Sequence, residues 1–476
     1  MKSIFAAVFV AVGVASLPAA DSPLSIQNLQ APFDCVGRIG PAADPLPREA
    51  VSDDKAAAEN AIRALRARGP AGLRALLEAH DETLKRHNSD KTLPAATKPD
   101  AAWLRLKAAL DGVSQQHDCF ASRLYWFTDF EQAKAAAKAG GKPILSLRLL
   151  GRLDEEFSCA NSRFFRTTLY ANAGVAKYLG DHFILDWKSV RPVPKVTIDF
   201  GDGRKLERTL TGNSIHYVLD ADGRVIDALP GLYGAQPFLR ELARAEEMAR
   251  RVSTLAGEPR ELALREYHRA RLTALNEEYT ADLQRLAAVA PAPIERIGVA
   301  PLLSGSQPPT AQIAATLAVG KRAVEQTILR RTASALPSRQ PDTAGDDGLW
   351  QRIGALHPEW ARVDESSRAL IREKNPTAFA AARITTGKAF IENPVLRQIR
   401  NLERSISEDT ARNEYLFHAK IHEWLAAGRA PVSVDALNAQ VYAELFLTPD
   451  SDPWLGLRSN DSFAALENDG IVLNKP

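Results

Sequence analysis

The sequence predicts a central α/β domain flanked by mainly α-helical N- and C-terminal regions. Short apolar runs alternate with helix-like segments between residues 120 and 252, which is the pattern of a sheet layered with helices. The flanking regions, 21–119 and 253–476, instead carry apolar residues at the spacing of amphipathic helices. The chain has 476 residues, 45% of them hydrophobic and 25% charged, and this composition excludes a wholly disordered chain.

Charge and short motifs exclude several classes of function. Lys and Arg number 60 and Asp and Glu number 58, so the net charge of +2 gives no support for nucleic-acid binding through bulk charge. The sequence has no Gly-rich phosphate loop and no Gly-x-Ser-x-Gly nucleophile elbow. We therefore expect no nucleic-acid partner and no cofactor.

The first residues have the pattern of a targeting signal. Lys2 is followed by an apolar run over 4–15 and by small residues up to Ala20, which is typical of a secretory signal peptide covering 1–20. The run is shorter than the roughly 20 residues of a membrane span. We expect cleavage after Ala20, with Ala15 as the alternative, and a periplasmic or extracellular protein without membrane association. An uncleaved N-terminal anchor is the other interpretation.

The cysteines are few and odd in number. They are Cys35, Cys119 and Cys159. Export leads to a compartment where disulfides form, and an odd count leaves at least one thiol outside an intramolecular bridge. Cys35 and Cys119 both follow an Asp in a turn-rich context and flank the same helical segment, so we expect a structural disulfide between them. Two unpaired buried thiols are the alternative.

The N-terminal region is predicted to contain three helices. Ser52 is the expected cap of the first, which ends at the stop signal Gly69-Pro70. The second covers about 71–85, where leucines recur at helical spacing. The third follows Asp100.

The central region, 120–252, is predicted to run helix, strand, helix, strand, two hairpins and a closing helix. Each hairpin surrounds a Gly/Asp turn, at 201–203 and 220–223, and we interpret both as turns and not as calcium loops. The expected elements are helix 129–139, strand 144–150, helix 162–179, strand 183–187, hairpin strands 195–200 and 208–211, hairpin strands 215–219 and 225–228, and helix 237–251.

The C-terminal region, 253–476, is predicted to be helical with two flexible linkers. The segments 291–309 and 338–347 are rich in Pro, Ser, Gly and polar residues and are the expected linkers. The expected helices are 261–288, 311–335, 363–373, 377–392, 396–425 and 434–446.

The middle of the chain resembles the thioredoxin-like superfamily, in particular its exported members. The similar stretches are 126–133, 141–145, the region of Cys159, 182–187 and 217–225. The resemblance implies a thioredoxin-like sheet of four or five strands over about 124–250, with helices on both faces. It also implies an active Cys-x-x-Cys motif after the first core strand, at the start of a helix.

The sequence departs from this family at its active motif. The corresponding stretch is Cys159-Ala160-Asn161-Ser162, so the first cysteine is matched and the second position is Ser162. The family's cis-proline would fall near Asn213, where no proline is present. The loop before Cys159 is also longer than in the family. The resemblance therefore implies the fold with an incomplete dithiol site.

The chemistry expected at Cys159 is that of a single thiol. A helix N-terminus favours the thiolate, and Ser162 could donate a hydrogen bond to the sulfur but cannot resolve a mixed disulfide. Nearby charges have opposing effects: acidic Asp154, Glu155 and Glu156 against basic Arg163 and Arg166.

Two functions remain open. In the first, an exported thioredoxin-fold protein uses Cys159, with Ser162, for thiol–disulfide exchange or client binding, with a protein or a low-molecular-weight thiol as partner and without dithiol turnover. In the second, the fold is a redox-inert scaffold or protein-interaction module.

A second group of polar residues lies in the C-terminal region. Glu414, His418 and His422 recur at a spacing of four on one predicted helix, with Glu423 adjacent. Two histidines at i and i+4 can bind one metal ion, but the order is not that of the His-Glu-x-x-His motif. We expect a helix edge whose histidines border the core, and no metal site. The basic residues around 188–208 are likewise expected to be a solvated hairpin face.

Overall fold

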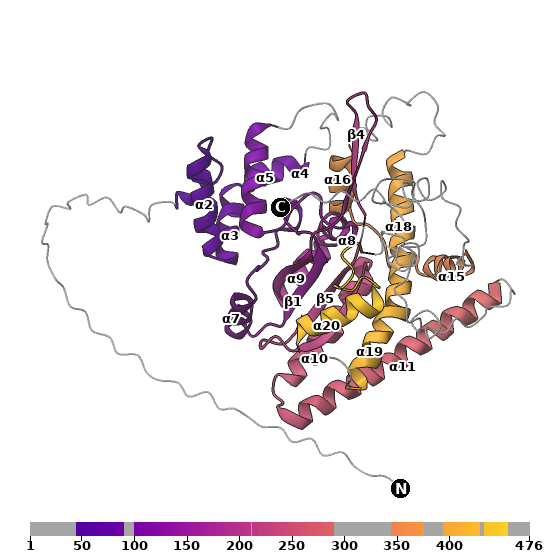
Figure 1. The fold of residues 1–476 in the computed structure, drawn as a ribbon. Helices are drawn as coiled ribbons and strands as arrows, with labels where there is room; N and C mark the ends of the chain where they lie inside the picture. Colours follow the sequence, from indigo (N-terminus) through magenta and orange to yellow (C-terminus); the bar gives the residue numbers. More distant parts are fainter. Residues whose placement is uncertain are drawn as a thin grey trace, which may run out of the picture. The chain divides into compact units, whose positions relative to one another are not determined.

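A four-stranded mixed β-sheet and a separate two-stranded hairpin contain the strands of the protein's described residues (Figure 1). The sheet order is β2-β1-β5-β6, with β1 and β2 parallel and the other pairs antiparallel. Its strands are β1 Ile144–Leu150, β2 Ile184–Arg191, β5 Ser214–Leu219 and β6 Val225–Pro230. The hairpin of β3 Lys195–Asp199 and β4 Lys205–Thr209 is inserted between β2 and β5. All six strands were predicted from the sequence.

The structure is a computed structural model, and it describes residues 44–89, 100–210, 212–289, 344–375, 394–428 and 433–455. Several predicted features lie outside these residues: the signal peptide 1–20, Cys35, the linker 291–309 and the helices 311–335 and 377–392. The described residues from Pro45 onward belong to one compact unit.

The two faces of the sheet differ in what covers them. All seven residues of β1 are buried, as expected for a strand that is packed on both sides. Strand register places Ser146, Asp186 and Tyr217 on one face, which we call the α20 face. Leu147, which alternates with Ser146 along β1, lies on the opposite face, which we call the α10 face.

Helices α7 Phe130–Gly140, α8 Ala160–Phe164, α9 Ala173–His182 and α10 Ala235–Val252 accompany the sheet. The Asp129 carboxylate caps α7 by accepting hydrogen bonds from two backbone N–H groups. The predicted continuous helix 162–179 is wrong. Helix α8 continues into the π-helical turn η1 Phe165–Leu169, a turn over 170–172 breaks the helix, and the Asn172 side chain starts α9 by accepting from the Val175 N–H.

The N-terminal helices are α1 Leu46–Glu49, α2 Lys55–Ala67, α3 Pro70–Ala79, α4 Asp81–Ser89, α5 Ala101–Ser114 and α6 Cys119–Ser122. Asp54, and not the predicted Ser52, caps α2, because its carboxylate accepts from two N–H groups of the first turn. The predicted helix 71–85 is two helices, since His80 leaves helical geometry with φ −117° and ψ 17°.

The C-terminal helices are α11 Gly257–Val289, α15 Ala344–Ala355, α16 Glu365–Lys374, α18 Pro394–Arg412, α19 Ala419–Ala426 and α20 Val434–Gln440, with π-helical turns η3 Asn413–His418 and η4 Val441–Leu445. The predicted linker 338–347 is wrong over 344–347, which belong to α15. Within the described residues, no helix is both long and apolar enough to cross a membrane.

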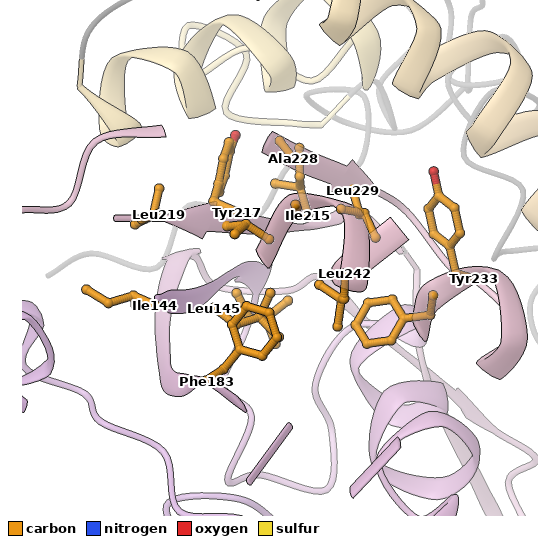
Figure 2. Packing of buried hydrophobic residues seen from close by; sticks show 14 of the residues in the cluster. Ile144, Leu145, Phe183, Ile215, Tyr217, Leu219, Ala228, Leu229, Tyr233 and Leu242 are labelled. Carbon is orange, nitrogen blue, oxygen red and sulfur yellow. The ribbon is translucent and has the colours of Figure 1, made fainter. Parts of the chain in front are cut away.

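The core of the sheet also contains C-terminal helices. Figure 2 shows Tyr217 pointing away from Phe183 and Leu242, which lie on the other side of the sheet. The same hydrophobic cluster includes side chains of η3, α19, α20 and η4: Phe417, Ile421, Leu437, Val441 and Tyr442. Tyr217 donates a hydrogen bond to Asn438 of α20 at 3.3 Å, so α20 packs on the α20 face. Residues 433–455, called the covering segment below, therefore complete the core of the sheet.

Candidate functional site

Cys159 lies at the start of α8, as the sequence predicts. Its backbone N–H donates to Leu150 at the end of β1 (3.2 Å), which places it directly beyond that strand. The Ser162 N–H donates to the Cys159 sulfur at 3.5 Å, so the thiol is the N-cap of the helix. Cys159 and Ser162 are therefore brought together through the backbone of Ser162. Both residues are completely buried, with 0% of their surface exposed.

The covering segment closes the space next to this thiol. The Cys159 thiol donates to the carbonyl oxygen of Asn213 at 3.9 Å, and the Tyr442 hydroxyl donates to the same oxygen at 3.1 Å. The Asn213 side chain donates to the Thr448 hydroxyl at 2.8 Å. Arg191 of β2 donates to the Thr448 carbonyl at 2.9 Å. The peptide bonds of Asn213 are trans.

The Ser162 hydroxyl does not have the predicted role. Its oxygen is buried and makes no hydrogen bond within the described residues, so only the Ser162 backbone contacts the sulfur. The adjacent Asn161 donates to the Ser214 hydroxyl at 3.0 Å, which ties the first turn of α8 to β5.

Two of the charged residues predicted near the thiol, Glu156 and Arg166, take part in a group of ion pairs. Arg166 is buried and pairs with Asp118 at 3.2 Å, and it also donates to the Glu156 carbonyl at 3.2 Å. Asp118 further pairs with Lys107 at 2.8 Å and Lys374 at 2.9 Å. We call this group, completed by His117, the ion network; its members are Lys107, His117, Asp118, Glu156, Arg166 and Lys374.

The ion network has clear effects on pKa values. Burial alone would raise the pKa of Asp118, but Lys374 and Lys107 lower it. The hydrogen bond from His117 is the largest effect on Glu156 and lowers the pKa of that carboxyl group. Burial alone would lower the pKa of His117, but its hydrogen bonds to Asp111 and Glu156 raise it.

Cys119 is a completely buried thiol at the start of α6. It is in no disulfide within the described residues, and its thiol donates to the Leu124 carbonyl at 3.9 Å. Burial raises the pKa of this thiol. The Cys35–Cys119 bridge stays a prediction because Cys35 lies outside the described residues.

A buried cluster of three histidines and an aspartate joins the sheet to the C-terminal helices. Asp227 is on β6, His268 is on α11, His418 is the last residue of η3 and His422 is on α19. We call these four residues the His–Asp cluster; none of them is more than 2% exposed. His418 Nε2 lies 3.0 Å from Asp227 Oδ1, and His422 Nδ1 lies 2.9 Å from His268 Nδ1.

The cluster only partly matches the sequence prediction. His418 and His422 do lie together, with ring centroids 4.2 Å apart. Glu414 instead bonds to Arg240 of α10, and burial followed by repulsion from Glu241 raises the pKa of Glu414 to about 7. Glu423 is partly exposed and pairs with Lys420 at 2.9 Å.

Sequence reasoning missed Asp227 and His268. Asp227 could have been noticed because it is a carboxylate inside the apolar strand Val-Ile-Asp-Ala-Leu-Pro. An unpaired charge is costly at such a position, so a partner was to be expected. His268 gave no such signal, because one histidine on a long helix is ordinary. Nothing in the sequence showed that these two residues would meet His422.

The protonation states of the cluster differ. Burial alone would raise the pKa of Asp227, but His422 and His418 hold it well below its usual range. Burial would lower the pKa of His418, but the nearby Asp227 raises it. Burial lowers the pKa of His268 to about 4 and, together with His418, lowers that of His422. His268 and His422 are thus neutral imidazoles near pH 7.

Comparison of the chain with protein-family models, with curated proteins and with solved structures gave no match.

Proposed function

We propose that residues 124–250 form a thioredoxin-like domain that serves as a redox-inert scaffold for the helical C-terminal region. The sheet order supports this proposal: a parallel β1–helix–β2 unit is followed by the antiparallel strands β5 and β6 and the closing helix α10. This is the order that the sequence resemblance implies, with the β3–β4 hairpin as an insertion.

The observation that carries the scaffold function is the burial of the motif. Thiol–disulfide exchange requires one sulfur to attack another, so the attacking thiol must be accessible to its partner. Cys159 and Ser162 are both 0% exposed. The Tyr442 hydroxyl shares the Asn213 carbonyl oxygen with the thiol, next to the place where a client would have to approach.

The helices that this scaffold would hold can be identified. The α20 face, which would otherwise be open, binds α20 through Tyr217 and Asn438. Arg148 of β1 adds a longer-range ion pair with Asp435 of α20, at 3.6 Å. Helix α16 packs on η1, where the Ser367 hydroxyl donates to the Thr168 carbonyl at 2.9 Å. The domain thus positions helices from two distant parts of the chain.

A single-thiol exchange protein is the second candidate. One observation favours it: Cys159 caps α8 and accepts the Ser162 N–H, the geometry in which a helix N-terminus favours a thiolate. In this case the covering segment would have to move before a protein disulfide or a low-molecular-weight thiol could reach the sulfur.

Thiol accessibility separates the two candidates. The native full-length chain is treated with an alkylating reagent at pH 8, and modification of the Cys159 peptide is followed by mass spectrometry. The chain is a Cys35→Ser variant, so that Cys119 is a free thiol and an equally buried internal control, and the denatured, reduced chain reports full reactivity. In this variant the scaffold function predicts that Cys159 and Cys119 are both modified only as fast as the chain unfolds. Fast native modification of Cys159 alone would favour exchange.

An insulin-reduction assay is the second test. Wild type, Cys159→Ser and Ser162→Cys are compared with dithiothreitol as reductant. The scaffold function predicts background rates for all three, because the added thiol at 162 would lie beneath the same covering segment. Turnover by Ser162→Cys that is lost in the double variant with Cys159→Ser would contradict it.

We also propose that the protein is exported. The support is the signal-like pattern of 1–20 alone. N-terminal sequencing of the protein recovered from a periplasmic or culture fraction should begin at Asp21. Recovery of the uncleaved chain in the membrane fraction would favour the anchor interpretation.

A further inference from the structure

The His–Asp cluster has the donor set of a transition-metal site. One donor atom from each of Asp227, His418 and His422 lies within 4.8 Å of the others, and these residues are completely buried. His268 supplies a fourth donor, 2.9 Å from His422. Ligands of a tetrahedral zinc ion with bonds of about 2.0–2.1 Å lie about 3.3 Å apart, so the close donor pairs already have nearly the right spacing.

The close contacts of the cluster join lone-pair donors. The contact between His268 Nδ1 and His422 Nδ1 holds without an ion only if one ring donates a proton and the other accepts it. An ion that accepts a lone pair from both nitrogens would take the place of that proton. The other ring nitrogens, His418 Nδ1 and His422 Nε2, are buried and make no hydrogen bond within the described residues, so they do not hold the rings in a different orientation.

The surroundings suit a cation. The Tyr267 hydroxyl donates to Asp227 Oδ2 at 2.6 Å, and the Ala228 N–H donates to Oδ1 at 2.8 Å; Oδ1 also faces His418. Outer-shell hydrogen bonds of this kind orient metal-binding carboxylates. Arg271, which acts electrostatically on His422, is paired with Glu241 at 3.0 Å, so its charge is compensated.

The local backbone adds a further observation. His418 is the last residue of the π-helical turn η3, and His422 follows on α19. Single π-helical turns occur frequently at functional sites. The spacing of four between the two histidines places both rings on the side that faces Asp227, as their shared contact group shows.

We propose that Asp227, His418 and His422, with His268 as fourth ligand, bind one divalent metal ion of the zinc class. Imidazole-rich donor sets favour zinc and its neighbours and disfavour magnesium and calcium, which prefer oxygen ligands. The ion replaces the proton between His418 and Asp227. It cross-links β6, α11 and the η3–α19 helix, so its role is structural and is independent of whether Cys159 reacts.

The ion network provides a useful contrast. His117, Asp118 and Glu156 also offer donor atoms within 4.8 Å of one another. Three cations already neutralise these carboxylates: Lys107, Arg166 and Lys374. A metal ion there would have to displace or oppose these charges, so this second group is an ion-pair network and not a metal site.

The experiment uses the full-length chain, treated with EDTA and dialysed against buffered micromolar free Zn²⁺. Elemental analysis measures the bound zinc in wild type, Asp227→Asn and His422→Gln. The matched control is His117→Gln, which removes a histidine from the ion network. We expect about one zinc per chain in wild type and control, and loss of stoichiometric binding in both cluster variants. Tyr267→Phe should weaken binding by about 10–100-fold, the usual effect of losing an outer-shell hydrogen bond.

Two further measurements keep the test decisive if a cluster variant does not fold. Co²⁺ bound to the wild type should give the strong visible bands of a four-coordinate ion, and Zn²⁺ should displace them. Zn²⁺ should also raise the Tm of the EDTA-treated wild type. Absence of zinc binding and of the cobalt bands in the folded wild type would overturn the proposal, as would equal binding by folded Asp227→Asn.

Discussion

Cys159 and Asn213 are 54 residues apart in the sequence, yet the thiol of the first donates to the carbonyl oxygen of the second at 3.9 Å. The Tyr442 hydroxyl reaches the same oxygen from the covering segment at 3.1 Å. Three regions of the chain therefore meet at one carbonyl group. A change in the docking of the covering segment should therefore also change the reactivity of the Cys159 thiol.

Replacing Tyr442 should loosen this junction. Tyr442→Ala removes a side chain that is 1% exposed, and we expect it to lower the free energy of unfolding by about 3–5 kcal/mol, the usual cost of truncating a buried aromatic residue. Tyr442→Phe removes only the hydroxyl and should cost about 1 kcal/mol. Urea denaturation measures both.

The exposed Trp454 provides the control for Tyr442. Trp454→Ala, at a residue that is 41% exposed, should change stability by less than about 0.5 kcal/mol. Native alkylation of Cys159 should be faster in Tyr442→Ala than in the other variants. If Tyr442→Ala is as stable as wild type, the covering segment does not belong to the core.

The buried pair of Arg148 and Asp186 should be costly to break. Arg148 Nη1 lies 3.1 Å from Asp186 Oδ2, both residues are 2% exposed, and the Ser146 hydroxyl donates to the same oxygen. Arg148→Met leaves the Asp186 charge buried without its cation, so we expect a loss of about 3–5 kcal/mol. Arg148→Met combined with Asp186→Leu should cost less than the sum of the two single changes.

Lys188 offers a matched control for Arg148. It is the cross-strand partner of Arg148 in the sheet register, and it pairs with Asp435 at 2.9 Å while both side chains are more than half exposed. Lys188→Met should cost at most about 1 kcal/mol, as surface ion pairs do. Equal costs for Lys188→Met and Arg148→Met in chemical denaturation would contradict the buried-pair argument.

Gly234 should not tolerate a side chain. A Cβ atom added there would lie 1.9 Å from the backbone carbonyl oxygen of Trp360, so the loop after β6 and the loop before α16 would have to separate. We expect Gly234→Ala to destabilise the protein by about 1–3 kcal/mol or more, the cost of overpacking.

Gly140→Ala is the control for Gly234→Ala. An added Cβ there meets its nearest atom at 4.0 Å within α7, so it should be neutral or slightly stabilising. Thermal unfolding of both variants would show the difference, and a neutral Gly234→Ala would contradict the close contact.

The ion network should give a pH-dependent contribution to stability. The pKa of His117 is raised above 6.5, so its stabilisation is complete below that value and is lost as pH rises through the folded-state pKa. The pKa of Glu156 is lowered below 4.5, so its stabilisation is complete above that value and is lost in acid. Both contributions are present together between about pH 4.5 and 6.5.

Denaturation at several pH values tests this contribution. The stability difference between wild type and His117→Gln should be largest near pH 5.5, on the order of 0.5 kcal/mol as for partly exposed pairs, and smaller at pH 8.5. Leu104→Ala, at a half-exposed apolar residue, is the control: its stability difference from wild type should not show this dependence on pH. A His117→Gln difference that grows with pH would contradict the assignment.

The strands were predictable because their signals are local. β1 reads as a continuous apolar run since it is buried on both faces, and the 201–203 and 220–223 turns mark the two hairpins. The position of Cys159 at a helix start was predicted from the resemblance of its stretch to the Cys-x-x-Cys motif. Its burial was not, because the covering segment that contributes to it is more than 200 residues away.

The errors also have physical causes. The 162–179 segment has helical periodicity throughout, and periodicity alone does not show that η1 widens into a π-helical turn before α9 starts again at Asn172. The His–Asp cluster combines residues from β6, α11, η3 and α19. One sequence carries the spacing of His418 and His422 within a helix but not the tertiary contacts that add Asp227 and His268.

The dependence of the sheet on the covering segment has a consequence for synthesis of the chain. Tyr217 and its partner Asn438 are separated by 221 residues, so the α20 face stays open to water on a nascent chain until translation has passed α20. Contacts of such long sequence separation form slowly. Until they form, the apolar side chains of the α20 face are exposed and can associate with other chains. The α20 face is therefore the surface on which a general chaperone should be needed during biogenesis.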